Sequence, residues 1–192
     1  GVNDMLGRNW ASVFSLLTLL VFFKLAREYL DGPGLVAAAA FFAFNPLIVE
    51  FSTSIQPEGL MLLFYLASVL FFVRWIDRER DGDFAWAALF TALALLAKMT
   101  AGHIGLLFAF WLLRKHGFGV LSRWRVWIFG AVSLVPAAVW FIHAKGLWKA
   151  YGNSLGVSNE YHWIGADFFT NPYFLKGILG SEIFWVWSLG GF

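Results

Sequence analysis

The 192-residue sequence contains no cysteine, and only 14% of its residues are charged. Without cysteine there is neither a disulfide framework nor thiolate chemistry, and the redox compartment stays undetermined. A soluble domain carries about 25% charged residues, so the scarcity of charge excludes an ordinary soluble domain. Hydrophobic residues make up 60% of the chain and the mean hydropathy is +0.69, which indicates an integral membrane protein.

Apolar segments recur along the whole sequence. A helix needs around 20 apolar residues to cross a bilayer; six segments come close, and a seventh begins near residue 178. A polar stretch at 98–103, between two of the shorter segments, predicts a hairpin turn. Gly1 in place of a starting Met, and the apolar run at 183–192, lead us to expect a piece of a longer protein. We predict an all-α, polytopic transmembrane bundle in a single domain over residues 1–192, with helices at about 10–26, 33–49, 59–76, 84–97, 104–113, 126–142 and 178–192 and an extracytoplasmic loop at 144–177.

The basic residues are distributed unequally between the two sides of this predicted bundle. The positive-inside rule places the loops that are richer in Lys and Arg in the cytoplasm. Alternate loops on one side carry nine of the 14 Lys and Arg residues, and the other side carries five. We therefore expect the stretches 50–58, 98–103 and 143–177 to be extracytoplasmic. The nine residues assigned to the cytoplasmic side are Lys24, Arg27, Arg74, Arg78, Arg80, Arg114, Lys115, Arg123 and Arg125.

Pro57 and Glu58 stand where one of the predicted membrane helices begins. Proline suits the first helical position because its missing N–H would have no partner there. A carboxylate in the first turn is favoured by the helix dipole by about 0.3–1 kcal/mol. Glu58 is therefore open to two interpretations, a helix-start acid at a wet interface or a functional carboxylate.

Several short motifs occur in the order that is typical of one enzyme family. They are Arg8-Asn-Trp10, Asn45-Pro46, Gln56-Pro57-Glu58-Gly59-Leu60 and Leu95-Leu-Ala-Lys98. With these motifs the chain resembles the membrane part of the protein mannosyltransferase and aminoarabinose transferase family, which is related to glycosyltransferase family 39 and has the C-type glycosyltransferase fold. The resemblance spans almost the whole sequence.

This resemblance implies a hexosyl- or pentosyltransferase that takes its sugar from a polyprenyl-phosphate lipid and passes it to an extracytoplasmic lipid, glycan or protein acceptor. It implies an integral protein of a bacterial plasma membrane, acting on the cell envelope at the outer surface, with no nucleic-acid partner. It also places the main catalytic carboxylate in a loop upstream of Arg8, outside this sequence apart from Asp4. Glu58 is then a supporting acid.

The predicted outer face carries groups that suit such a transfer. The reaction needs a carboxylate to take the acceptor's proton, and cations or a metal to stabilise the departing phosphate. The alternative for Arg8 and Lys98 is a side chain that only reaches the headgroup layer. No cofactor is established; a divalent metal is left open, with His143 as its candidate ligand, although no spacing signature joins His143 to other ligands. The candidate phosphate-binding residues are Arg8, Lys98, His103 and Lys145.

Two other classes of function remain open. A secondary transporter or permease fragment would place polar residues near the bilayer midplane, whereas the centres of these predicted helices carry no charged residue. A non-catalytic membrane subunit is the second, because the expected catalytic loop lies outside the sequence. No zinc-type, Ser-His-Asp or P-loop arrangement is present. The gathering of polar groups on one face favours the glycosyltransferase.

Overall fold

The computed structural model describes residues 4–152, 170–173, 175–177 and 179–180. Contacts divide the chain into two compact units, one formed by Gly1–Phe44 with Ile48–Trp140 and the other by Asn45–Leu47 with Phe141–Phe192. The single transmembrane domain expected over residues 1–192 stays a prediction. The first unit contains most of the candidate functional residues.

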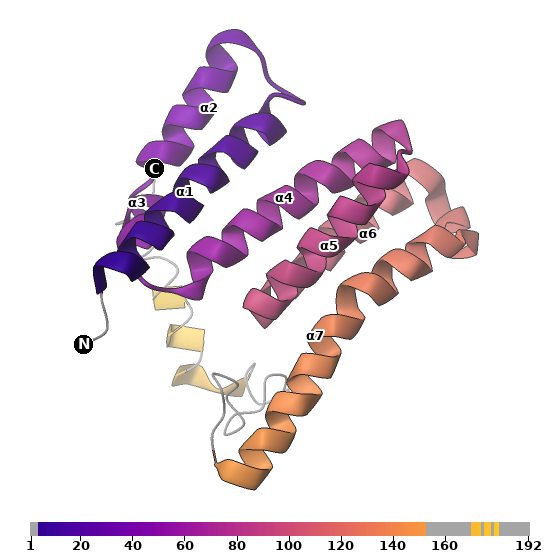
Figure 1. Cartoon of the computed structure of the whole chain (residues 1–192). Coiled ribbons are helices and arrows are strands. Elements are labelled where there is room, and N and C mark those ends of the chain that lie inside the picture. Colours follow the sequence, from indigo (N-terminus) through magenta and orange to yellow (C-terminus); the bar gives the residue numbers. More distant parts are fainter. Residues whose placement is uncertain (1–3, 153–169, 174, 178, 181–192) are drawn as a thin grey trace. The chain divides into compact units, whose positions relative to one another are not determined.

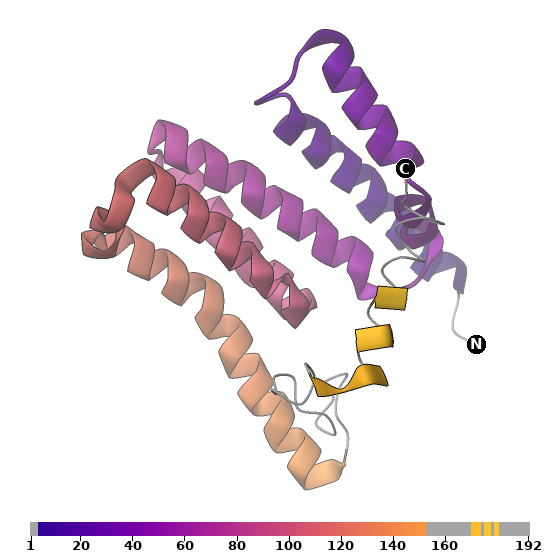
Figure 2. The same ribbon diagram turned by 180° about the vertical axis from the view of Figure 1, so that it is seen from behind.

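All regular structure in the described residues is helical, and these residues form no strand, which confirms the predicted all-α class. Figures 1 and 2 show the helices from opposite sides, with α1, α4 and α5 lying side by side. The helices are α1 (Asp4–Ala26), α2 (Gly32–Phe44), α3 (Pro46–Thr53), α4 (Pro57–Arg78), α5 (Asp81–Ala97), α6 (Ile104–His116) and α7 (Trp124–Tyr151), with 3-10 turns η1 (Met99–His103) and η2 (Gly117–Ser122) on either side of α6.

Four stretches of helix are long and apolar enough to cross a membrane. They are Met5–Ala26, Pro57–Arg78, Met99–Ser122 and Trp124–Tyr151, and the bent pair α2 and α3 adds a fifth if it counts as one span. Helix α5 is shorter, with 17 residues. The described residues therefore supply four or five spans, where the sequence suggested six or seven membrane helices. The last of those, at 178–192, lies almost entirely outside the described residues.

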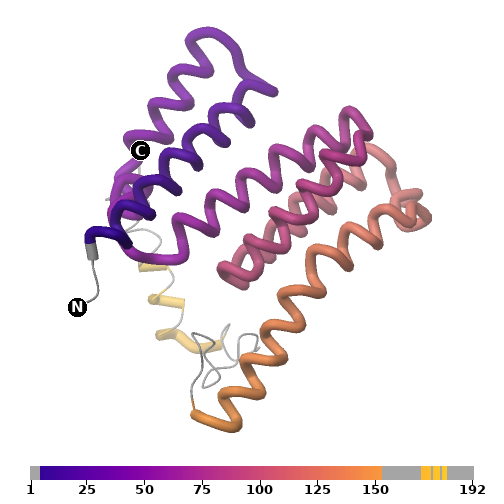
Figure 3. The backbone as a smooth tube through the Cα atoms, viewed as in Figure 1, coloured from indigo at the N-terminus to yellow at the C-terminus, as the bar shows by residue number. Residues whose placement is uncertain are grey.

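The helix expected over 33–49 is interrupted, which corrects the sequence-based prediction. Helix α2 ends at Phe44, α3 begins at Pro46, and the two are bent by 53° at the break. Proline lacks the N–H that would continue the helical ladder, and it disfavours the helical conformation of the residue before it, here Asn45. The Asn45 Oδ1 accepts a hydrogen bond from the Leu47 N–H at 3.0 Å and so starts the new helix. Figure 3 follows this path from α2 through α3 into α4.

Helix α7 is longer than the segment 126–142 that its apolar residues predicted. It continues to Tyr151, so residues 144–151 of the expected extracytoplasmic loop are helical. Lys145 and Lys149 are exposed there, and exposed polar side chains do not oppose a helix that extends beyond its apolar part. The rest of that expected loop, at 153–169, lies outside the described residues.

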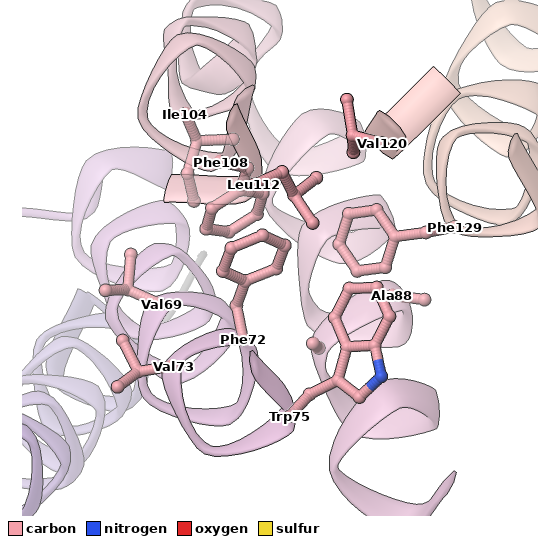
Figure 4. Packing of buried hydrophobic residues seen from close by; sticks show 11 residues of the cluster. Val69, Phe72, Val73, Trp75, Ala88, Ile104, Phe108, Leu112, Val120 and Phe129 are labelled. Atoms are coloured by element: carbon pink, nitrogen blue, oxygen red, sulfur yellow. The ribbon is translucent and has the colours of Figure 1, made fainter. Parts of the chain in front are cut away.

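An aromatic cluster forms the core of the first unit (Figure 4). Phe72 of α4 is fully buried, and its ring stacks on Phe108 of α6 with 3.8 Å between the ring centroids. Trp75 and Phe129 each meet the same ring edge-on at 5.5 Å. Since these four side chains come from α4, α6 and the first part of α7, the cluster fixes the packing of three helices.

Many large apolar side chains lie on the outside of the helices. Leu106 is 76% exposed and Phe118 86% exposed, and α1 and α2 present further apolar residues along their length. Contiguous apolar surface on this scale is unfavourable in water and is normal against lipid. The exposed surface therefore agrees with the apolar spans in identifying an integral membrane protein.

Candidate functional site

The beginning of α4 positions Glu58. Gln56 has an extended backbone, with φ −135° and ψ 151°, and Pro57 occupies the first turn, as the sequence indicated. Glu58 follows in that same turn, where unpaired backbone N–H groups favour a carboxylate. The local sequence thus explains why an acidic side chain stands at this end of a long apolar helix.

Lys98 meets Glu58 from the end of α5. Its backbone is extended, with φ −158° and ψ 124°, so the helix stops and the chain enters the 3-10 turn η1, where the sequence predicted a hairpin. The Lys98 Nζ donates a hydrogen bond to the Glu58 Oε1 and forms an ion pair with it. The side chains are 39% and 24% exposed, respectively. Two predicted site residues, 40 positions apart, are therefore in direct contact.

The second carboxylate oxygen of Glu58 has no such partner. Oε2 is buried and receives no hydrogen bond from any of the described residues. Buried polar atoms nearly always have a hydrogen-bond partner, and an exception calls for an explanation such as a functional role. Half of the carboxylate is thus held by Lys98, while the other half keeps its capacity to accept a hydrogen bond.

Arg8 lies at the same end of the first unit. Its Nη1 donates to the Thr53 carbonyl oxygen at 3.4 Å, and the Ser12 hydroxyl donates to the Ser52 carbonyl oxygen at 3.1 Å. Both carbonyls belong to the last turn of α3, where no donor is available within the helix. Arg8 is otherwise exposed, and it stands beside the link that leads from α3 to Glu58.

His103 lies at the end of η1, close to Lys98 in the sequence. Its Nδ1 is 2.6 Å from the Thr100 carbonyl oxygen, which requires the proton on Nδ1 and leaves Nε2 as the acceptor of the neutral ring. The imidazole centroid is 5.2 Å from the ring of Tyr65. Tyr65 follows Glu58 by two helical turns and so shares its face of α4. Tyr65 was not among the predicted site residues, although its spacing from Glu58 was an available signal.

The remaining candidates belong to the second unit. His143 and Lys145 lie on the last part of α7, within the second unit. Within the described ranges, no three His, Cys, Asp or Glu side chains gather closely enough to hold a metal ion. The roles of His143 as a metal ligand and of Lys145 as a phosphate ligand stay predictions.

The larger cavities lie at the other end of α4. Three cavities of about 400–500 Å³ are lined by α4 residues between Val73 and Glu79. Near the start of α4, a void beside Gly59 measures only about 10 Å³. The candidate site therefore centres on the Glu58–Lys98 ion pair, with Arg8 bonded to Thr53 and His103 bonded to Thr100 on segments that adjoin these two residues in the sequence.

Together, the long apolar helices and the charged groups near their ends define a polytopic membrane protein. The profile of the dolichyl-phosphate-mannose-protein mannosyltransferase family matches residues 1–143. The chain belongs to this family, and membership implies a membrane glycosyltransferase of the mannosyltransferase type. No curated protein and no solved structure matches the chain significantly.

Proposed function

We propose that the protein transfers a sugar from a polyprenyl-phosphate donor to an extracytoplasmic acceptor, and that the Glu58–Lys98 pair belongs to its donor site. The observation that carries this proposal is the ion pair itself, which joins the start of α4 to the end of α5 and leaves Glu58 Oε2 without a hydrogen-bond partner in the described part of the chain. Family membership supports the class of reaction. The exposed Arg8 adds a cation that the pair does not neutralise.

In the proposed reaction, an acceptor hydroxyl oxygen attacks the anomeric carbon, and the bond from that carbon to the phosphate oxygen breaks. The lipid phosphate leaves with the electron pair of the broken bond. The hydroxyl proton passes to a carboxylate, which the family resemblance places upstream of Arg8. Lys98 and Arg8 donate hydrogen bonds to the departing phosphate, whose negative charge increases as the bond breaks.

Glu58 acts in this proposal as a positioning residue. An ammonium group on a flexible four-carbon chain has many conformations, and the carboxylate restricts Lys98 to those that face the start of α4. Oε2 offers a buried acceptor for a hydroxyl or an added cation at the same place. The pair therefore supplies an oriented donor and a free acceptor together.

Lys98→Met in the full-length protein tests the proposal. We expect the rate of sugar transfer from the lipid donor to fall by about 10²-fold, the size of the loss of one donor to a developing oxyanion. The matched control is Lys115→Met, which breaks a second Glu–Lys contact at the other end of α4, between Lys115 and Glu79. This control should retain transfer.

A charge-reversed variant, Glu58→Lys with Lys98→Glu, separates a chemical role from a structural one. It restores an ion pair between α4 and α5 but moves the ammonium group to the other helix. Rescue of transfer by this double variant would assign the pair to folding alone and overturn the proposed donor contact. Uptake of a tracer into liposomes without a lipid-linked sugar would instead favour the transporter.

A further inference from the structure

A strongly basic cavity lies between the last turns of α1 and α4. Lys24 and Arg27 reach it from the end of α1, and Arg74 and Arg78 from the end of α4, with Glu28 among them. The cavity has a volume of about 400 Å³. It stands at the opposite end of α4 from Glu58, so it is separate from the candidate site described above.

Glu28 organises two of these four cations. Its Oε1 accepts a hydrogen bond from the Arg74 Nε at 2.7 Å, and its Oε2 accepts one from the Arg78 Nη2 at 3.1 Å. The Glu28 side chain is 23% exposed and the Arg74 side chain 25% exposed. Both carboxylate oxygens are therefore used to hold guanidinium groups beside the cavity.

The other two cations differ from this pair of arginines. Lys24 and Arg27 are exposed, and neither has a carboxylate partner among the described residues. With one acid and four bases, the cavity walls carry a formal charge of +3. Such a set of oriented guanidinium and ammonium donors suits the several oxygens of a phosphate group.

The positive-inside rule explains why basic residues are frequent at one end of a bundle, but it concerns only how many there are. It does not require residues about 50 positions apart to line one cavity, nor a carboxylate that fixes two of them. Basic cavities between the ends of membrane helices suit the phosphate of an anionic lipid headgroup.

We propose that this cavity binds the phosphate headgroup of an anionic phospholipid from the membrane leaflet on that side. The acyl chains would lie along the apolar surfaces of α1 and α2, where Leu20 and Phe41 are exposed. The inference does not depend on the proposed glycosyl transfer, since it uses other residues at the other end of α4.

Lipid retention tests this site in the full-length protein. The protein is purified in detergent and titrated with phosphatidylglycerol or phosphatidylcholine, and bound lipid is measured by native mass spectrometry. Each basic residue near a membrane surface contributes about 1 kcal/mol, so Arg27→Gln should weaken phosphatidylglycerol binding about fivefold and Lys24→Gln with Arg27→Gln about 25-fold. The control Arg80→Gln removes the same charge just beyond α4, outside the cavity, and should change binding by less than about twofold.

The other outcomes decide against the proposal. Equal losses in Arg27→Gln and Arg80→Gln would show an attraction to overall charge rather than a site. Equal retention of the zwitterionic phosphatidylcholine, which also contains a phosphate, would remove the selectivity for a net anionic headgroup on which the assignment rests. Displacement of phosphatidylglycerol by inorganic phosphate at comparable concentration would assign the cavity to a soluble phosphate instead of a lipid.

Discussion

Two Glu–Lys pairs at the two ends of α4 offer a test of how burial sets the strength of an ion pair in this bundle. Glu58 pairs with Lys98, and Glu79 approaches Lys115 with 3.8 Å between Nζ and Oε1. The perturbation is a double-mutant cycle at each pair, with Glu→Gln and Lys→Met singly and together. Both cycles remove the same two kinds of side chain, and Lys115 in addition donates a hydrogen bond to the Ile76 carbonyl oxygen.

The expected magnitudes follow from exposure. Glu79 is 65% exposed and has a long contact, so its pair should resemble an exposed ion pair, with a coupling free energy of about 0.5 kcal/mol or less. The Glu58 side chain is 24% exposed and makes a direct hydrogen bond. Removing one partner of a fully buried pair destabilises a protein by about 3–5 kcal/mol. Because Lys98 remains 39% exposed, we expect about 1–2 kcal/mol for this coupling.

The assay is the free energy of unfolding of the full-length protein in mixed micelles, measured for the four members of each cycle. Coupling is the part of the double-mutant effect that the two single effects do not explain. A difference of 1–2 kcal/mol changes the ratio of folded to unfolded protein by about 5- to 30-fold, which such titrations resolve. Equal coupling at both ends of α4 would refute the reasoning from burial.

Three further changes test other parts of the structure. Phe72→Ala should lower the free energy of unfolding by about 3–5 kcal/mol, because it empties the aromatic core, whereas Phe118→Ala at an exposed position should have little effect. Ser12→Ala removes the hydrogen bond to the Ser52 carbonyl and should lower the free energy of unfolding by about 1 kcal/mol. Amide exchange at the end of α3 should become faster, and unchanged exchange would contradict this expectation. Partial burial raises the pKa of Tyr29 above its ordinary value of 10.0. The free energy of unfolding of the wild type relative to Tyr29→Phe should therefore be constant below about pH 10 and fall as the pH rises further. Free energies of unfolding that change with pH in parallel for the two proteins would contradict this.

The sequence predicts those parts of the fold that depend on local signals. Long apolar runs give membrane helices, and Pro57 marks the beginning of α4 because a missing N–H is tolerated at that position. Glu58 and Lys98 were both predicted at the same face, because each adjoins the end of an apolar run. For the same reason Arg8 was placed near them.

Contacts between distant elements could not be read from the sequence. The pairing of Lys98 with Glu58 depends on how α4 packs against α5, and the contact of His103 with Tyr65 depends on the turn η1. Asn45-Pro46 is a different case, since the local signal for a helix break was present but the surrounding apolar residues outweighed it. An uninterrupted apolar run predicts a segment buried in lipid. A continuous helix depends in addition on backbone N–H groups that donate hydrogen bonds, and proline lacks this group.

The unbroken course of α4 has a consequence for the membrane that suits the protein. Glu58 and Arg78 are about 20 residues apart, and a rise of about 1.5 Å per residue separates them by about 30 Å. This separation equals the hydrocarbon thickness of a typical bilayer, about 30 Å. Longer acyl chains would draw one charged end into hydrocarbon, and shorter chains would tilt the helix or thin the bilayer around it. Hydrophobic mismatch therefore links the chain length of the surrounding lipids to the position of Glu58 relative to the headgroup layer.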